Sequence, residues 1–223
     1  MERSHMQRLM ILTGIFMLVL MGVVSPGDIN EQPVVPQHVI DQIETRARHQ
    51  KYIAKRDAEM WNLFVDAIAA ETGIKDRELA EIVAQAIEDA SSEFDLSPWL
   101  IASLIRVESA GNPNAVSLVG AIGLTQIMPR TGAEIAARLE IANYTSASLN
   151  DPATNVRMGC AYLRELLDRF GNEHAALAAY NWGPAHIAKR IERREALPVQ
   201  YPAKILKRIP EQPAWVEKNL ARS

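Results

Sequence analysis

The stretch SPWLIASLIRVES, residues 97–109, decides what kind of fold this chain can adopt. Ser97 followed by Pro98 is a typical helix start, because serine caps the first turn and proline fits its first position. The residues that follow are apolar on nearly every side, so we expect this helix to lie inside a domain. Gly111-Asn112-Pro113 predicts its end, since glycine suits a left-handed cap and the residue before proline avoids helical geometry.

Helical periodicity extends on both sides of this stretch. Residues 37–72 form a highly charged helical pattern whose apolar residues cluster at its end, and a second amphipathic pattern follows Gly73 and runs to about Phe94. The glycine-interrupted segment 114–131 predicts a compact loop or small hairpin. Helical patterns then resume, in 152–170, 174–181 and 185–195. We therefore expect a mainly α fold with at most a small hairpin, preceded by N-terminal helices.

Composition excludes several classes of function. The 48% hydrophobic content of the 223 residues is enough for a sizeable core, and the formal net charge of -3 shows no basic excess for binding nucleic acid. The single cysteine, Cys160, cannot form an intrachain disulfide, and its helical setting predicts a buried apolar residue. The five histidines show no paired metal-ligand spacing. We expect neither a metal nor a cofactor.

The amino terminus carries the order of an export signal. Residues 9–24 run LMILTGIFMLVLMGVV behind Arg3 and Arg8. As a helix this segment would span roughly 24 Å, short of the roughly 30 Å of a bilayer core. A cleaved signal peptide and a retained inner-membrane anchor both stay open, with a slight preference for the anchor because the exit at residues 23–27 is a poor cleavage site. Either interpretation places the rest of the chain in the periplasm.

Glu108 is the candidate catalytic residue. It lies in the last turn of the apolar helix, where burial and the helix carboxyl end both disfavour an ionised carboxylate and raise its pKa. Burial should dominate, because it moves a pKa by up to several units whereas the helix end contributes less than about one. A carboxylic acid still protonated near neutral pH can protonate the leaving oxygen of a glycosidic bond.

Three ordered motifs surround this acid. ES at 108–109 is followed by NPNAVS at 112–117, GAIGLTQIMP at 120–129 and AYNWGP at 179–184. In these motifs the sequence resembles the soluble lytic transglycosylase (SLT) domain family, which is related to goose-type lysozyme. The resemblance implies a lysozyme-like helical domain that cleaves peptidoglycan. It divides the chain into a signal peptide or membrane anchor (1–27), a linker and helical N-terminal extension (28–90), an SLT catalytic domain (91–195) and a C-terminal extension (196–223).

The resemblance also implies a mechanism. Glu108 would protonate the bond between N-acetylmuramic acid and N-acetylglucosamine, then accept the proton of the muramic C6 hydroxyl, leaving a 1,6-anhydro end. Ser117 would hydrogen-bond near the glutamate, and Gln126 and Met128 would line the sugar groove. Tyr180 and Asn181 would support the acid and the substrate from the opposite wall. No Asp or Glu lies between Glu108 and Glu134, which agrees with a lone acid.

Two positions depart from the family pattern. Thr125 stands where the family often has methionine, and the family's Glu-Thr-x-x-Tyr segment is poorly represented by Leu197-Pro198-Val199-Gln200-Tyr201. Both departures concern the subfamily and part of the substrate groove, and neither removes the acid.

Several interpretations stay open. A muramidase of the same fold would use water as its nucleophile and give hydrated ends. A wall-binding or assembly module would hold glycan without cutting it, and an anchored helical scaffold would not contact sugar at all. By analogy, an anchored enzyme of this size would suit a secretion, conjugation or pilus machine that spans the envelope, or wall recycling during growth.

Overall fold

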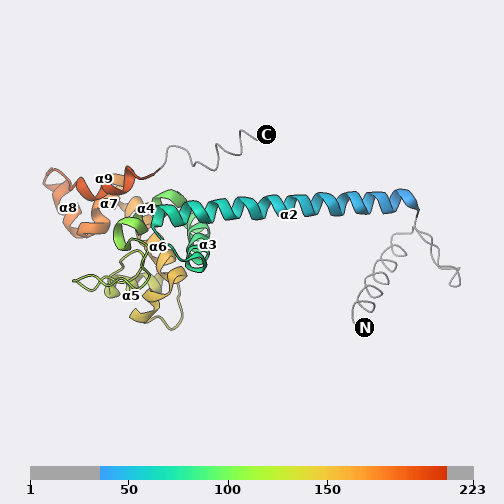
Figure 1. The fold of residues 1–223 in the computed structure, drawn as a ribbon. Coiled ribbons are helices and arrows are strands. Elements are labelled where there is room, and N and C mark those ends of the chain that lie inside the picture. The colour runs from blue at the N-terminus through green and yellow to red at the C-terminus, as the bar shows by residue number, and fades with distance from the viewer. Residues whose placement is uncertain (1–35, 210–223) are drawn as a thin grey trace. The chain divides into compact units, whose positions relative to one another are not determined.

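The computed structural model describes residues 36–209, which form helices α2–α9, the short 3-10 helix η1 and two isolated β-bridges (Figure 1). The chain divides into two compact units, residues 1–56 and residues 57–223. Within 36–209, no helix is both long and apolar enough to cross a membrane. The predicted signal or anchor at residues 9–24 lies outside the described range.

Helix α2 spans Gln37–Thr72 and contributes to both units. In the first unit, none of its residues up to Arg56 is buried, as its charged pattern predicts. In the second unit it buries Val65, Ile68 and Thr72. The prediction that only the end of this helix is packed is therefore confirmed.

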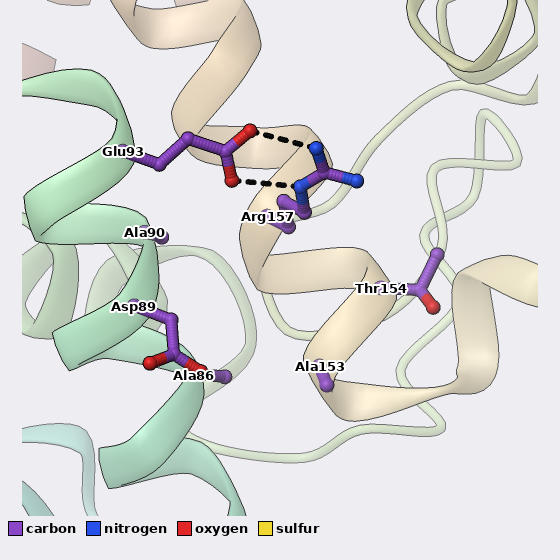
Figure 2. Close-up of a pocket in the computed structure, with 7 residues that line it drawn as sticks. All are labelled: Ala86, Asp89, Ala90, Glu93, Ala153, Thr154 and Arg157. Atoms are coloured by element: carbon purple, nitrogen blue, oxygen red, sulfur yellow. Dashed lines mark hydrogen bonds and ion pairs between the residues drawn. The ribbon is translucent and has the colours of Figure 1, made fainter. Parts of the chain in front are cut away.

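Helix α3, Arg77–Phe94, begins where the Asp76 side chain accepts the Leu79 N–H at 2.8 Å, and it packs against α6, Pro152–Phe170. Ala86 and Ala90 of α3 lie on the same side as Glu93 and line a pocket together with Ala153 and Arg157 of α6. Figure 2 shows the Glu93 carboxylate on α3 facing the Arg157 guanidinium on α6, with N–O distances of 2.8 and 2.7 Å. The ion pair borders a small pocket of about 210 Å³, whose floor includes Ala86 and Ala153.

Helix α4, Pro98–Ser109, is the centre of the second unit, and its residues 100–105 are all buried. It ends slightly earlier than the sequence predicts: Ala110 already has a left-handed conformation, with φ 52°, and its N–H bonds the Arg106 carbonyl. Gly111 continues the left-handed turn with φ 80°. The predicted glycine cap is thus preceded by an alanine that carries the strain of this conformation.

Residues 110–128 form the predicted hairpin. Ile122 makes antiparallel bridges with both Val116 and Ile127, and these two isolated bridges are the only β structure within 36–209. The loop ends three residues earlier than predicted, because α5 begins at Pro129 and runs to Arg138. Proline at the first position of a helix needs no hydrogen-bond partner, which accounts for the early start.

The remaining elements are η1 (Ser146–Asn150), α7 (Glu173–Trp182), α8 (Pro184–Glu192) and α9 (Gln200–Leu206). Asp151 and Asn172 cap α6 and α7 through bonds of 2.8 and 2.9 Å, and Gly171, with φ 73°, ends α6. The main core joins residues of α2, α3, α4, α6 and α7, including Cys160, with Ile187 of α8 and Ile205 of α9. The expected mainly α fold with a small hairpin is confirmed.

Candidate active site

Glu108 lies in the last turn of α4, directly after the buried run of that helix, and is itself mostly buried. Burial raises the pKa of its carboxyl group from 4.5 to about 7, and a hydrogen bond from Tyr201 partly offsets this effect. The Glu108 carboxyl group is therefore partly protonated near neutral pH.

Tyr201 donates its hydroxyl hydrogen bond to Oε1 of Glu108. It lies on α9, which packs against α4 and is held by the buried Pro202 and Ile205. Burial and the neighbouring glutamate raise the pKa of Tyr201 well above its usual value, so the hydroxyl keeps its proton and remains a donor. Of the poorly matching segment 197–201, the final tyrosine is the residue that contacts the acid.

Ser117 closes the hairpin turn. Its N–H donates to the Ala121 carbonyl and its hydroxyl accepts from the Ala121 N–H, both at 2.9 Å. The described residues give Ser117 no hydrogen bond to Glu108. Its assignment to the neighbourhood of the acid stays a prediction.

Gln126 stabilises the loop of residues 110–128 through hydrogen bonds within that loop. Its backbone is left-handed, with φ 53°, and its side-chain amide donates to the carbonyls of Ala115 at 3.1 Å and Gly123 at 2.9 Å. Met128, at the start of α5, is 40% exposed. The amide donors of Gln126 are engaged by the loop, whereas the Met128 side chain is partly open to solvent. Both substrate assignments stay predictions.

The buried pair Thr125 and Asn155 holds the loop against α6. The Asn155 side-chain carbonyl accepts from the Thr125 N–H at 2.8 Å and from its hydroxyl at 2.7 Å. The Asn155 amide donates to the carbonyls of Ile122 at 3.0 Å and Leu149 at 2.8 Å. A threonine hydroxyl can make this bond and a methionine cannot, which gives a physical reason for the departure at position 125.

Tyr180 connects the loop to α7. Its hydroxyl donates to the Thr125 carbonyl at 2.8 Å, and its ring packs on Tyr162 with centroids 5.2 Å apart. Burial and the Glu108 charge both raise the pKa of Tyr180, so the ring lies within electrostatic reach of the acid. Its direct bond is to the loop, so any support of the acid by Tyr180 is indirect.

Asn181 is exposed and lines a pocket of about 610 Å³. Tyr201 lines the same pocket, so the pocket adjoins the residue that bonds the acid. The other polar or aromatic groups on its wall include Trp182, His186, Arg190 and Lys204. The sequence analysis did not predict that these four residues line a pocket. The one indication in the sequence is Trp182, which lies inside the AYNWGP motif.

Comparison with known proteins identifies the family of this chain. The model of the transglycosylase SLT domain matches residues 85–201, just over half of the chain, from within α3 to the tyrosine that contacts Glu108. The chain belongs to the transglycosylase SLT domain family. The SLT match extends past residue 195, where the predicted catalytic domain stops, and it begins before residue 91.

Relatives of the SLT domain occur in phage and bacteria. The chain is 38% identical over 132 residues to a transglycosylase of Enterobacteria phage PRD1, covering 56% of this chain and 42% of the relative. It is 42% identical over 87 residues to the soluble lytic murein transglycosylase of Escherichia coli K12, covering 38% of this chain and 14% of the relative. The chain therefore spans less than half the length of these relatives.

Solved structures of the same kind are also similar. An inactive mutant of the lytic transglycosylase Slt from Pseudomonas aeruginosa is 30% identical, with a TM-score of 0.48, over 54% of this chain and 20% of that one. The 70 kDa soluble lytic transglycosylase of Escherichia coli is also 30% identical, with a TM-score of 0.47, over 57% of this chain and 21% of that one.

Proposed function

We propose that this protein is a peptidoglycan lytic transglycosylase in which Glu108 is the only catalytic acid and base. The observation that carries the proposal is the lone, mostly buried glutamate with its pKa raised to about 7 inside an SLT domain. Near neutral pH such a group is divided between its acid and base forms, so it can donate a proton in one step and accept one in the next.

In the first step, the protonated Glu108 carboxyl gives its proton to the glycosidic oxygen between N-acetylmuramic acid and N-acetylglucosamine, and the bond from that oxygen to the anomeric carbon breaks. The Tyr201 hydroxyl, which donates to Oε1, stabilises the carboxylate left behind. Because the pKa of Tyr201 is raised, the tyrosine keeps its own proton during this step.

In the second step, the Glu108 carboxylate takes the proton of the muramic C6 hydroxyl, whose oxygen bonds to the anomeric carbon. The product is a 1,6-anhydro ring, no water is consumed and the enzyme regains its starting proton. Enzymes that use water or a covalent intermediate normally carry a second carboxylate about 5 to 9.5 Å from the first. The segment between Glu108 and Glu134 contains no Asp or Glu, so the neighbouring loop supplies no second carboxylate, which favours the internal nucleophile.

We assign the substrate-facing roles to the hairpin and the end of α7. Gln126 holds the loop that carries Met128, and the exposed Met128 and Asn181 face substrate. Ser117 shapes the turn of that loop, and Tyr180 ties the loop to α7. These residues orient the glycan strand so that its glycosidic oxygen meets the acid.

We further propose that the protein acts in the periplasm on glycan strands, exported by residues 9–24 as a signal peptide or inner-membrane anchor. A transglycosylase that opens local gaps for a secretion, conjugation or pilus machine fits an anchored enzyme. Support comes from the apolar segment behind two arginines and from the relatives named as membrane-bound lytic murein transglycosylases, which are 34% identical to this chain over 113 residues.

The test is mass spectrometry of the soluble products after incubating purified peptidoglycan with the full chain. We expect anhydro-muropeptides from the wild type and none from Glu108→Gln. Glu134→Gln, which removes an exposed carboxylate, should release the same products as the wild type. Hydrated ends would identify a muramidase, and the absence of products from the wild type would contradict the enzyme proposal.

A further inference from the structure

The pocket of about 610 Å³ beside the acid has a basic wall. Arg190 and Lys204 line it, and none of its lining residues is Asp or Glu. The pocket lies in a basic segment: residues 184–208 hold seven Lys or Arg and two Glu, although the whole chain has a formal net charge of -3. Two of these seven cations, Arg190 and Lys204, line the pocket next to the proposed site of cleavage.

The two cations of the wall are held differently. Arg190 is oriented by its Nε, which donates to the Ala196 carbonyl at 2.9 Å, and its charge is partly balanced by Glu195 at 3.6 Å. Lys204 is exposed, and no partner among residues 36–209 is recorded for it. The pocket thus combines a fixed guanidinium with an unpaired ammonium, a combination that suits a carboxylate ligand.

Trp182 adds an apolar face to the same pocket. Its side chain is 55% exposed at the end of α7, and its ring stacks on His186 with centroids 5.6 Å apart and planes 24° apart. Stacking on His186 restricts the indole in the absence of ligand, so less ordering is needed on binding. Large exposed aromatics of this kind commonly mark binding surfaces.

We propose that this pocket binds the acidic stem peptide carried by the muramic acid residue that Glu108 cleaves, an inference that rests on the proposed function. The glycan itself is uncharged apart from its peptides, so a cationic wall needs a ligand from the peptide, whose carboxylates Arg190 and Lys204 would bind. Trp182 would pack on the apolar part of the same peptide. Tyr201 belongs to both the pocket wall and the Glu108 hydrogen bond, so peptide binding and cleavage share one residue.

The test compares peptide-bearing glycan strands with strands stripped of peptide by an amidase, in which the lactyl carboxyl group that the amidase frees is then converted to its methylamide so that the stripped glycan is uncharged. We expect the wild-type full chain to have a kcat/KM roughly tenfold higher on peptide-bearing strands, since a charge-assisted hydrogen bond contributes about 1.5 kcal/mol or more. In the double variant Arg190→Ala, Lys204→Ala this preference should fall to about one. Lys189→Ala, which removes an exposed lysine of α8 outside the pocket, should keep it.

Several outcomes would overturn the peptide site. One is a wild type whose kcat/KM is the same on peptide-bearing and stripped strands. Another is a double variant that still has the higher kcat/KM on peptide-bearing strands. A third is a double variant that loses only binding to phosphatidylglycerol vesicles, which would assign the basic wall to a membrane. In each of these cases anhydro products from stripped strands would leave the transglycosylase proposal standing. Absence of products from both substrates would reject the two proposals together.

Discussion

The Tyr201 hydroxyl donates to the Glu108 carboxylate across 93 positions of sequence. The bond favours the ionised form of Glu108 and so opposes the effect of burial on its pKa. The Tyr201 hydrogen bond orients the Glu108 carboxyl group and limits the rise of its pKa.

Replacing this tyrosine should therefore change the pH dependence of cleavage. In Tyr201→Phe the pKa of Glu108 should rise, so the falling limb of the pH–rate profile should move to higher pH. We expect kcat near the optimum to fall roughly tenfold, the effect of losing about 1.4 kcal/mol of stabilisation of the carboxylate. A profile of unchanged shape would show that Tyr201 does not set the acidity of Glu108.

Glu108 should also make stability depend on pH. A carboxyl whose pKa is raised on folding contributes stability that is fully present below its unfolded pKa, near 4.5, and lost as the pH rises through about 7. We expect Glu108→Gln to gain roughly 3 kcal/mol relative to the wild type between pH 4.5 and pH 8. Urea unfolding at a series of pH values would measure it, with Glu134→Gln as the control for loss of a surface charge.

Asn155→Ala should be strongly destabilising. The amide of Asn155 makes bonds to Thr125, Ile122 and Leu149 in a fully buried position. The Ile122 carbonyl keeps its bond from the Ile127 N–H, but the Thr125 N–H and the Leu149 carbonyl each lose the bond to Asn155. We expect a loss of roughly 3 kcal/mol in the free energy of unfolding. Asn150→Ala, at an exposed position with one bond of 3.3 Å, should cost less than about 1 kcal/mol. Equal effects of the two substitutions would contradict the role of the buried network.

Gly159→Ala should disturb the same network from α6. A Cβ at Gly159 would come within 2.5 Å of the Thr125 hydroxyl oxygen and within 2.6 Å of its Cβ, so one of the two segments must move. We expect a loss of roughly 1 to 3 kcal/mol, typical of overpacking in a well-packed core. Thermal unfolding measures the loss, and a Tm equal to that of the wild type would show that the loop has room to shift.

The Glu93–Arg157 ion pair in Figure 2 should contribute little. Its hydrogen bonds lower the pKa of Glu93, so its stabilising effect is present above the unfolded pKa and lost as the pH falls. Because both side chains are about 40% exposed, solvent screens the attraction and we expect Glu93→Gln to cost below about 1 kcal/mol. A larger cost that persists in 1 M salt would contradict this expectation.

The sequence predicts the helices well because their apolar positions recur at helical spacing. This holds for α3 and α6, whose ends at Phe94 and Gly171 agree with the structure. The partial burial and raised pKa of Glu108 are also predictable, since a glutamate in the last turn of an apolar helix lies beside buried residues. Tyr201 is not, because its contact joins α9 to α4 and depends on how the helices pack. The hydrogen bonds between Thr125 and Asn155 could not be predicted for the same reason, since the two residues are 30 positions apart in the sequence.

Because burial among the packed helices raises the pKa of Glu108 to about 7, the weak acidity of this carboxyl group is a property of the finished fold. A nascent or unfolded chain carries a glutamate of ordinary acidity, which is ionised at pH 7 and unable to protonate an ether oxygen. Under the proposed function, folding itself serves as the activation step, because only the folded domain buries Glu108 and raises its pKa.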